Sequence, residues 1–219
     1  MDFSVIEWED IWQASFDTLT MTGASLVLTI LLGLPLGVLL FLTSKKQLLE
    51  QRGIYALLSF IVNMLRSVPF IILLIVLIPF TLFLVGTSLG VAGTIPPLVI
   101  GTTPFFARLV ENVLRDVDKG IIEACQAMGA TTSQIIVRAL LPEALPGLLA
   151  ATTVTTIALV SYSAMSGVIG GGGLGDLALR FGYQRFQTEV MIVTVAILVI
   201  LVQLIQWLGD VLVAHFTRK

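Results

Sequence analysis

The chain has 219 residues, of which 57% are hydrophobic and only 12% are charged, and its formal net charge is −2. Soluble domains carry about a quarter charged residues, so this composition excludes an ordinary water-covered surface and favours a lipid-covered one. The weak negative charge argues against a nucleic-acid partner. One cysteine, Cys125, and one histidine, His215, exclude an intramolecular disulfide and leave little for a metal or catalytic site. We therefore expect an all-α polytopic membrane protein that is not an enzyme and carries no cofactor.

The N-terminal region lacks the pattern of a cleavable signal peptide, which begins with positive charges and has a short apolar core. The first 44 residues hold no Lys or Arg and five acids, namely Asp2, Glu7, Glu9, Asp10 and Asp17. Trp8 and Trp12 lie four residues apart beside these acids. Their position predicts a short interfacial helix ahead of the first membrane span.

Five segments are long and apolar enough to cross a bilayer, which takes about 20 apolar residues in a helix. They are residues 18–43, about 54–84, about 92–114, about 146–169 and 190–209, the last extending toward Phe216. No large polar segment separates them. We therefore expect one transmembrane domain over residues 1–219, with a core of about 15–213.

The second segment is too long for one straight span, and Pro69 and Pro79 predict kinks within it. Its boundary with the third segment is set only by turn-forming residues. These are Thr87, Gly90, Gly93 and the pair Pro96 and Pro97. We place the connecting turn there.

The distribution of Lys and Arg predicts the orientation, because cytoplasmic segments collect positive charge. If the N-terminus is outside, eight basic residues fall inside: Lys45, Lys46, Arg52, Arg115, Lys119, Arg138, Arg218 and Lys219. The opposite side then holds only Arg180 and Arg185. We expect an outside N-terminus and a cytoplasmic C-terminus.

The polar segment of about 116–145 predicts two short helices with a break between them. Gly129 is placed to end the first helix, since glycine adopts the left-handed conformation at little cost. Thr131 and Gln134 form a capping-box pattern that begins the second helix, which should end near Pro142. The local pattern alone fits two alternatives equally well: an interfacial helix that fills space, or a docking element.

The same segment carries the pattern E-A-A-x3-G-x9-I-x-L-P. It reads Glu123-Ala124-Cys125, then Gly129, Ala139, Leu141 and Pro142 at these spacings. Cys125 replaces the third-place alanine and Ala139 replaces isoleucine. With these two departures, the segment resembles the cytoplasmic loop of binding-protein-dependent ABC importer permeases.

The resemblance implies a type I ABC importer permease fold with five transmembrane helices, in which this loop inserts into a cleft of a separate ATPase. The implied ATPase-coupling residues are Glu123, Ala124, Gly129, Ala130, Thr131, Gln134, Leu141 and Pro142. The sequence contains no G-x-x-x-x-G-K-[ST] motif, so we expect ATP hydrolysis on another polypeptide.

The segment after the fourth span is rich in glycine. Gly170, Gly172 and Gly175 formally match G-x-G-x-x-G, but a membrane helix precedes them where a dinucleotide site requires a strand. Two interpretations remain, a flexible reversal of the chain or a mobile outer gate. The hydroxyl side chains of the fourth span either let helices approach closely or line a pathway. The candidate pathway or gate residues are Ser161, Tyr162, Met165 and Gly172.

Three charged residues lie within the apolar segments. Arg108 and Glu111 are three residues apart, so they can pair on one helix face, and we interpret them mainly as anchors at the inner surface. Arg66 is different, because a lipid-facing arginine at that depth costs a few kcal/mol. It is expected to face the interior of the bundle or a partner subunit.

Within the family, three segments closely resemble the permeases that import methionine: residues 161–167 with the following GGGGLGD and GYQRF, residues 63–73, and residues 142–147. This resemblance implies D- and L-methionine as cargo across a bacterial inner membrane. It also implies two ATP-binding subunits, an extracytoplasmic methionine-binding protein and a second copy of the chain as partners, with lipid around them. The alternatives are another amino acid or a small peptide as cargo, or an ion-coupled secondary transporter. The last would show inverted repeats and midplane acids, and we find neither.

Overall fold

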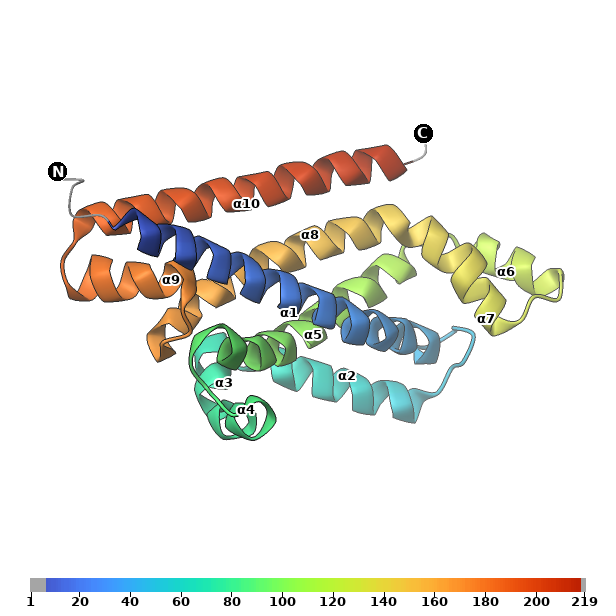
Figure 1. The fold of residues 1–219 in the computed structure, drawn as a ribbon. Coiled ribbons are helices and arrows are strands. Elements are labelled where there is room, and N and C mark those ends of the chain that lie inside the picture. Colours follow the sequence, from blue (N-terminus) through green and yellow to red (C-terminus); the bar gives the residue numbers. More distant parts are fainter. Residues whose placement is uncertain (1–6, 218–219) are drawn as a thin grey trace.

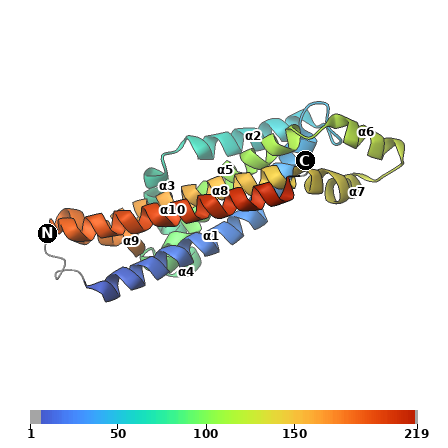
Figure 2. The ribbon, with the colours of Figure 1, turned by 90° about the horizontal axis from the view of Figure 1, so that it is seen from above.

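Residues 7–217 are described in a computed structural model of the chain. Four long helices lie along one another: α1 (Trp8–Thr43), α5 (Gly90–Arg115), α8 (Leu141–Met165) and α10 (Thr188–Phe216). Helix α1 packs along α5, and α8 contacts both α5 and α10 (Figures 1 and 2). Asp2, Arg218 and Lys219, which entered the signal-peptide and orientation arguments, lie outside the described residues.

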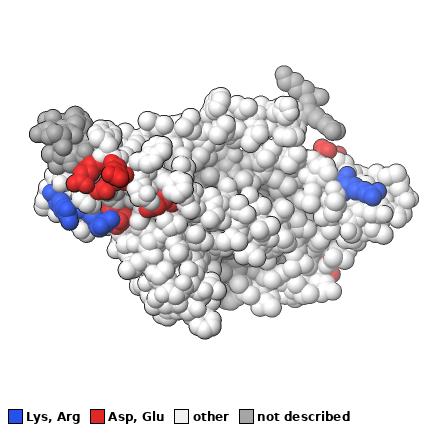
Figure 3. Space-filling model, viewed as in Figure 1, with Lys and Arg blue, Asp and Glu red and all other residues white. Residues whose placement is uncertain are grey.

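The described part of the chain is helical and contains no strand. Four helical stretches are long and apolar enough to cross a membrane, namely α1, α5, residues 132–169 and α10. A fifth span is present if α2 (Arg52–Ser67) and α3 (Phe70–Val76) are counted as one broken span. In the view of Figure 3, charged residues gather at the two ends of the molecule and leave an uncharged belt between them. This distribution suits a bilayer around the middle of the bundle.

The second predicted span is broken more sharply than a kink. Helices α2 and α3 meet at 100°, because Val68 is extended and Pro69 has no N–H to continue the helix. Pro79, which we expected to kink a helix, instead lies in the first turn of α4 (Ile78–Val85), where its missing N–H costs nothing. The expectation of a single kinked helix over residues 54–84 is therefore wrong.

The turn between the second and third spans is shorter than predicted. Gly86, with a φ of 81°, ends α4, and α5 already begins at Gly90. Gly93, Pro96 and Pro97 lie inside α5 rather than in the turn. A Cβ at Gly93 would collide with the backbone of Ser88, so this glycine lets the turn fold tightly against the helix.

The tryptophans near the N-terminus do not form a separate interfacial helix. Trp8 and Trp12 belong to the same continuous helix as the first span, and their side chains are exposed. No proline or glycine interrupts residues 8–22, so nothing ends the helix before the span begins. The prediction of a separate short interfacial helix is therefore wrong.

The helix after the predicted loop also continues where we expected it to stop. Helix α7 (Thr132–Ile135), the π-helical turn η2 (Ile136–Leu140) and α8 run on without a break. Pro142 lies in the first turn of α8, directly after η2. The wider π-helical turn lets the helix continue although proline has no N–H to donate to the preceding turn. The predictions that a helix ends near Pro142 and that the fourth span begins after Pro146 are therefore wrong.

The segments at the far end of the chain agree better with expectation. The fifth predicted span, residues 190–209 extending toward Phe216, is α10. Between α8 and α10 lie the short helices η3 (Ser166–Ile169), α9 (Gly173–Leu177) and η4 (Ala178–Gln184). These short helices form the end of the molecule opposite α6 (Lys119–Ala127) and α7 (Figure 1).

Candidate coupling and translocation sites

The predicted break in the polar loop is present and is built by hydrogen bonds. Asp118 begins α6, and its Oδ1 accepts a hydrogen bond from the Gly120 N–H at 2.8 Å. Gly129, with a φ of 77°, ends the helix. Its N–H donates to the Gln126 carbonyl at 2.9 Å, and the Ala130 N–H donates to the Cys125 carbonyl at 3.0 Å. These paired bonds satisfy carbonyls that the helix end would otherwise leave free.

The capping box predicted for the second helix is confirmed. The Gln134 N–H donates to Thr131 Oγ1 at 3.4 Å, and the Thr131 N–H donates to Gln134 Oε1 at 2.9 Å. Each side chain thus satisfies a backbone donor of the first turn. Helices α6 and α7 therefore form a hairpin of defined shape, which we call the α6–α7 hairpin (residues 118–135).

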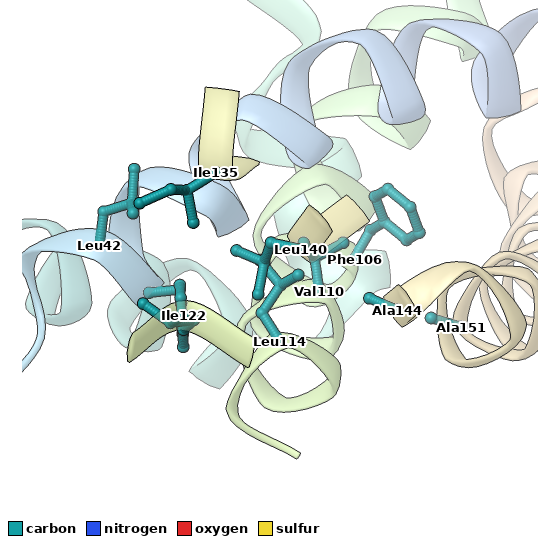
Figure 4. Close-up of a cluster of buried hydrophobic side chains, with 10 residues drawn as sticks. Leu42, Phe106, Val110, Leu114, Ile122, Ile135, Leu140, Ala144 and Ala151 are labelled. Atoms are coloured by element: carbon teal, nitrogen blue, oxygen red, sulfur yellow. The ribbon is translucent and has the colours of Figure 1, made fainter. Parts of the chain in front are cut away.

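One face of the α6–α7 hairpin is anchored in the bundle. Ile122 of α6 and Ile135 of α7 are buried in a cluster that includes Leu42 of α1 and Leu114 of α5 (Figure 4). Leu140 completes the cluster from η2. The hairpin is therefore packed directly against α1 and α5 through a close-packed core.

The opposite face of the hairpin is exposed. Of the predicted coupling residues, six are exposed and two, Ala130 and Leu141, are partly buried; the exposed ones are Glu123, Ala124, Gly129, Thr131, Gln134 and Pro142. Five of the exposed residues lie on the α6–α7 hairpin, on either side of its break, whereas Pro142 lies beyond the hairpin in the first turn of α8. Sequence reasoning missed Met128 and Val137, whose side chains are 78% and 61% exposed on the same hairpin and its extension. An apolar residue next to a helix-ending glycine was the signal that could have identified Met128.

The candidate pathway residues lie near the end of α8. Ser161 and Met165 are one helical turn apart and exposed, whereas Tyr162 is partly buried. The Tyr162 ring stacks on the Phe70 ring with centroids 4.4 Å apart and an interplanar angle of 6°. This contact joins α8 to α3, directly beyond the break in the second span.

Gly172 lies apart from that stack, in the glycine segment beyond α8, and hydrogen bonds join this segment to α5 and α1. The Gly90 N–H donates to the Gly170 carbonyl at 2.9 Å, and the Leu174 N–H donates to Thr18 Oγ1 at 2.8 Å. A Cβ at Gly171 would lie 2.5 Å from Ser166 Oγ. Gly172 is partly buried and has a φ of 79°. The glycines allow close packing here, and the flexible reversal and the mobile outer gate both stay predictions.

A cavity of about 110 Å³ opens beside the Phe70–Tyr162 pair. Arg66, Gly101 and Phe105 also line it. The cavity therefore places one candidate pathway residue, Tyr162, next to the unexplained arginine of the second span.

Arg108 and Glu111 form the predicted ion pair, with Arg108 Nη1 donating to Glu111 Oε2 at 2.5 Å. Their interpretation as surface anchors is wrong for Glu111, whose side chain is 1% exposed. Arg115 Nη2 and Tyr55 Oη donate to Glu111 Oε1 at 2.6 and 3.1 Å. Ser59 accepts a further bond from Arg108. This Glu111 cluster ties α2 to the end of α5, directly before the α6–α7 hairpin.

Comparison with known proteins decides the family. Residues 33–219 match the model of the family described as binding-protein-dependent transport system inner membrane component. The chain belongs to this family. It is therefore a multi-pass inner-membrane permease component, and the resemblance of its polar loop is confirmed at the level of the family.

Individual relatives match the permease over nearly its whole length. A probable D-methionine transport system permease protein from Vibrio cholerae is 50% identical over 206 residues, covering 94% of this chain and 92% of the relative. The methionine import system permease protein of Bacillus subtilis is 47% identical over 210 residues, covering 96% and 95%. A solved chain from an inward-facing MetNI methionine ABC transporter is 47% identical, covers 100% of both chains and has a TM-score of 0.95. The permease thus has the type I ABC importer fold.

Proposed function

We propose that the permease forms the translocation pathway of an ATP-driven importer for methionine, in both the D- and L-forms. One observation carries this proposal: the permease matches the chain of a methionine ABC transporter at 47% identity over its full length with a TM-score of 0.95. The names of the Vibrio cholerae and Bacillus subtilis relatives support the same cargo. The importer works by alternating access, and this chain performs no covalent chemistry.

The importer contains two copies of the permease, two ATP-binding subunits and an extracytoplasmic methionine-binding protein. The apolar faces of α2 and α10 are largely exposed, which supports a second copy or lipid around the chain. Of the most apolar stretch of α10, only 11% is buried. Two copies that face each other would enclose a pathway between them, which one bundle of this size does not provide.

The exposed face of the α6–α7 hairpin is the contact for the ATPase. Glu123, Ala124, Gly129 and Met128 gather around its tip. Closure of the ATPase dimer moves the hairpin, and the buried cluster of Ile122, Ile135 and Leu114 passes this movement to the bundle. A hairpin whose helices are capped transmits such a movement because it moves as one rigid element.

The orientation that suits this role has the N-terminus outside and the C-terminus in the cytoplasm. Among the described residues, the basic side chains toward the hairpin end support it: Lys45, Lys46, Arg52, Arg115, Lys119 and Arg138. Only Arg180 and Arg185 lie toward the other end. Ser161, Tyr162, Met165 and Gly172 then lie toward the outer half, where they line or gate the pathway.

The cargo can be tested by competition in cells that depend on this permease and its partner subunits for methionine. We expect uptake of labelled L-methionine to be inhibited by an excess of either unlabelled L- or D-methionine. Other amino acids and small peptides at the same concentration should leave the uptake rate unchanged. Stronger inhibition by one of these, with weak inhibition by methionine, contradicts the proposed cargo.

A further inference from the structure

Arg66 lies in a predicted membrane segment, and the described part of the chain offers no partner for its charge. It lies in the last turn of α2, which begins at Arg52, so at 1.5 Å per residue it is about 21 Å along the helix from Arg52, compared with about 30 Å for a hydrocarbon core. Its side chain is exposed, and it forms no hydrogen bond or ion pair with any of residues 7–217. By contrast, Arg108 and Arg115 are both bound to Glu111. A guanidinium at this depth requires an anion, since leaving it in lipid costs a few kcal/mol.

Arg66 lies beside a cavity with room for a small ligand. It lines the cavity of about 110 Å³ together with Phe70, Gly101 and Tyr162, and one water needs only about 10–15 Å³ by the same kind of measure. Gly101 keeps the space open, because a Cβ there would lie 3.2 Å from the Phe70 ring. Apart from the Arg66 guanidinium and the Tyr162 hydroxyl, the side chains that line the cavity are aromatic or aliphatic.

The break in the second span adds a polar feature of the opposite sign. Helix α2 ends at Ser67, Val68 is extended, and Pro69 has no N–H. The last carbonyls of α2 thus lack the donors that a continuing helix would supply, and the helix C-terminus carries partial negative charge. Broken membrane helices form the binding sites of many transporters for this reason.

We propose that Arg66 binds the α-carboxylate of the amino acid as it crosses the permease, with the Phe70–Tyr162 pair holding its apolar side chain. The planar guanidinium matches a carboxylate with two parallel hydrogen bonds. The end of α2 favours the ammonium group of the same zwitterion. This inference rests on the proposed function and gives the cargo a site within the membrane, separate from the binding protein.

The test measures binding of radiolabelled L-methionine to the purified permease–ATPase complex in lipid nanodiscs without the binding protein. We expect saturable binding to the wild type and about 10- to 100-fold weaker binding to Arg66→Gln, since a hydrogen-bonded charge is worth about 1.5–3 kcal/mol. The affinity of Arg66→Lys should fall between these two, because lysine keeps the positive charge but cannot make the two parallel hydrogen bonds of a guanidinium. Arg52→Gln, an exposed arginine at the other end of α2, is the matched control and should bind as the wild type does. Methioninol, which lacks the carboxylate, should bind the wild type and Arg66→Gln equally weakly.

Four outcomes overturn the inference: no saturable binding to the wild type, equal methionine binding by Arg66→Gln, equal binding of methioninol and methionine by the wild type, or separation of the two permease copies in Arg66→Gln. The last, detected by the mass of the complex, would show that Arg66 pairs across the subunit interface instead. Transport distinguishes this failure from that of the proposed function. If the wild type imports methionine on ATP and Arg66→Gln does so at the same rate, only the carboxylate site is wrong. If the wild type imports no methionine, the proposed function itself fails.

Discussion

At the scale of single residues, Glu111 shows how the permease tolerates charge in a membrane helix. Its carboxylate is 1% exposed and accepts hydrogen bonds from Arg108, Arg115 and Tyr55. A buried carboxylate is stable only when it is paired and hydrogen-bonded. The cluster joins residues of α2 and α5 that lie more than 50 positions apart in the chain.

Substituting Glu111 by Ala should destabilise the permease strongly, because two arginines then lose their common partner. Removing one member of a buried ion pair costs about 3–5 kcal/mol, and we expect the lower part of this range since the Arg115 side chain is 44% exposed. Thermal unfolding of the detergent-solubilised complex, followed by tryptophan fluorescence, measures the loss.

The control for this substitution is Glu50→Gln, in the exposed loop between α1 and α2. Its pKa is lowered by the Lys46 backbone N–H and the Arg52 side chain, which both donate to it, but exposed pairs contribute little. An unfolding temperature of Glu111→Ala that matches that of Glu50→Gln would contradict the role given to the cluster.

Gly129 provides a second prediction at this scale, because its requirement is conformational and not steric. Its φ is 77°, and nothing lies within 4 Å of where a Cβ would be. Gly129→Ala should therefore cost about 1–2 kcal/mol in the local geometry of the hairpin and reduce co-purification of the ATPase, while membrane insertion stays normal. Gly129→Asn should be milder, since asparagine tolerates this conformation.

Gly23→Ala is the matched control for Gly129. Gly23 also has open space around its Cβ position, but its backbone is helical, so the substitution should leave ATPase binding unchanged. ATPase co-purification that is equally strong in Gly129→Ala and Gly23→Ala would argue against the hairpin as the docking element.

At the scale of elements, the α6–α7 hairpin depends on its capping box. Thr131→Ala removes the acceptor for the Gln134 N–H and should destabilise the start of α7 by about 1 kcal/mol. Hydrogen exchange of residues 132–135 should become several-fold faster, whereas Thr131→Ser, which keeps the acceptor, should show the wild-type rate. Unchanged exchange in Thr131→Ala would mean that tertiary packing of Ile135, and not the cap, holds the helix.

Elements governed by local chemistry could be predicted from the sequence, and those governed by packing could not. Gly129, Thr131 and Gln134 were interpreted correctly because capping involves residues within one turn. Pro142 was misread because the π-helical turn before it, which lets the helix continue, has no recognised sequence signature. The bend at Pro69 was expected only as a kink, because a proline predicts that the helix is interrupted but not the 100° at which α2 and α3 meet.

The candidate sites follow the same division. The coupling residues share one segment and one motif, so the sequence could assemble them. The cavity at Tyr162 brings together residues of α2, α3, α5 and α8, and no local pattern links these helices. Arg66 was recognised as unusual, but its neighbours were visible only in the fold. Tyr55 was missed for the same reason, because it reaches Glu111 through a tertiary contact. Arg115 lies four residues after Glu111 on the same helix, so the spacing rule that paired Arg108 with Glu111 could also have identified it.

At the scale of the whole molecule, the proposed orientation makes a prediction about access from each side. In a permease with Cys125 replaced by Ala, a cysteine at Glu9 or at Met128 can be labelled, because both positions are exposed. A membrane-impermeant maleimide added to intact spheroplasts should label the Glu9→Cys variant and leave the Met128→Cys variant unlabelled until the membrane is opened. The reverse pattern would show that the bundle is inserted the other way.

In the proposed importer the chain has one task, which is to move methionine when a separate ATPase displaces the α6–α7 hairpin. The most direct test traps ATP inside proteoliposomes that contain the permease and its ATPase, and supplies loaded binding protein outside. We predict that labelled methionine accumulates inside above its external concentration only when ATP and the binding protein are both present. Accumulation driven by an imposed proton or sodium gradient, in vesicles without ATP, would contradict the account.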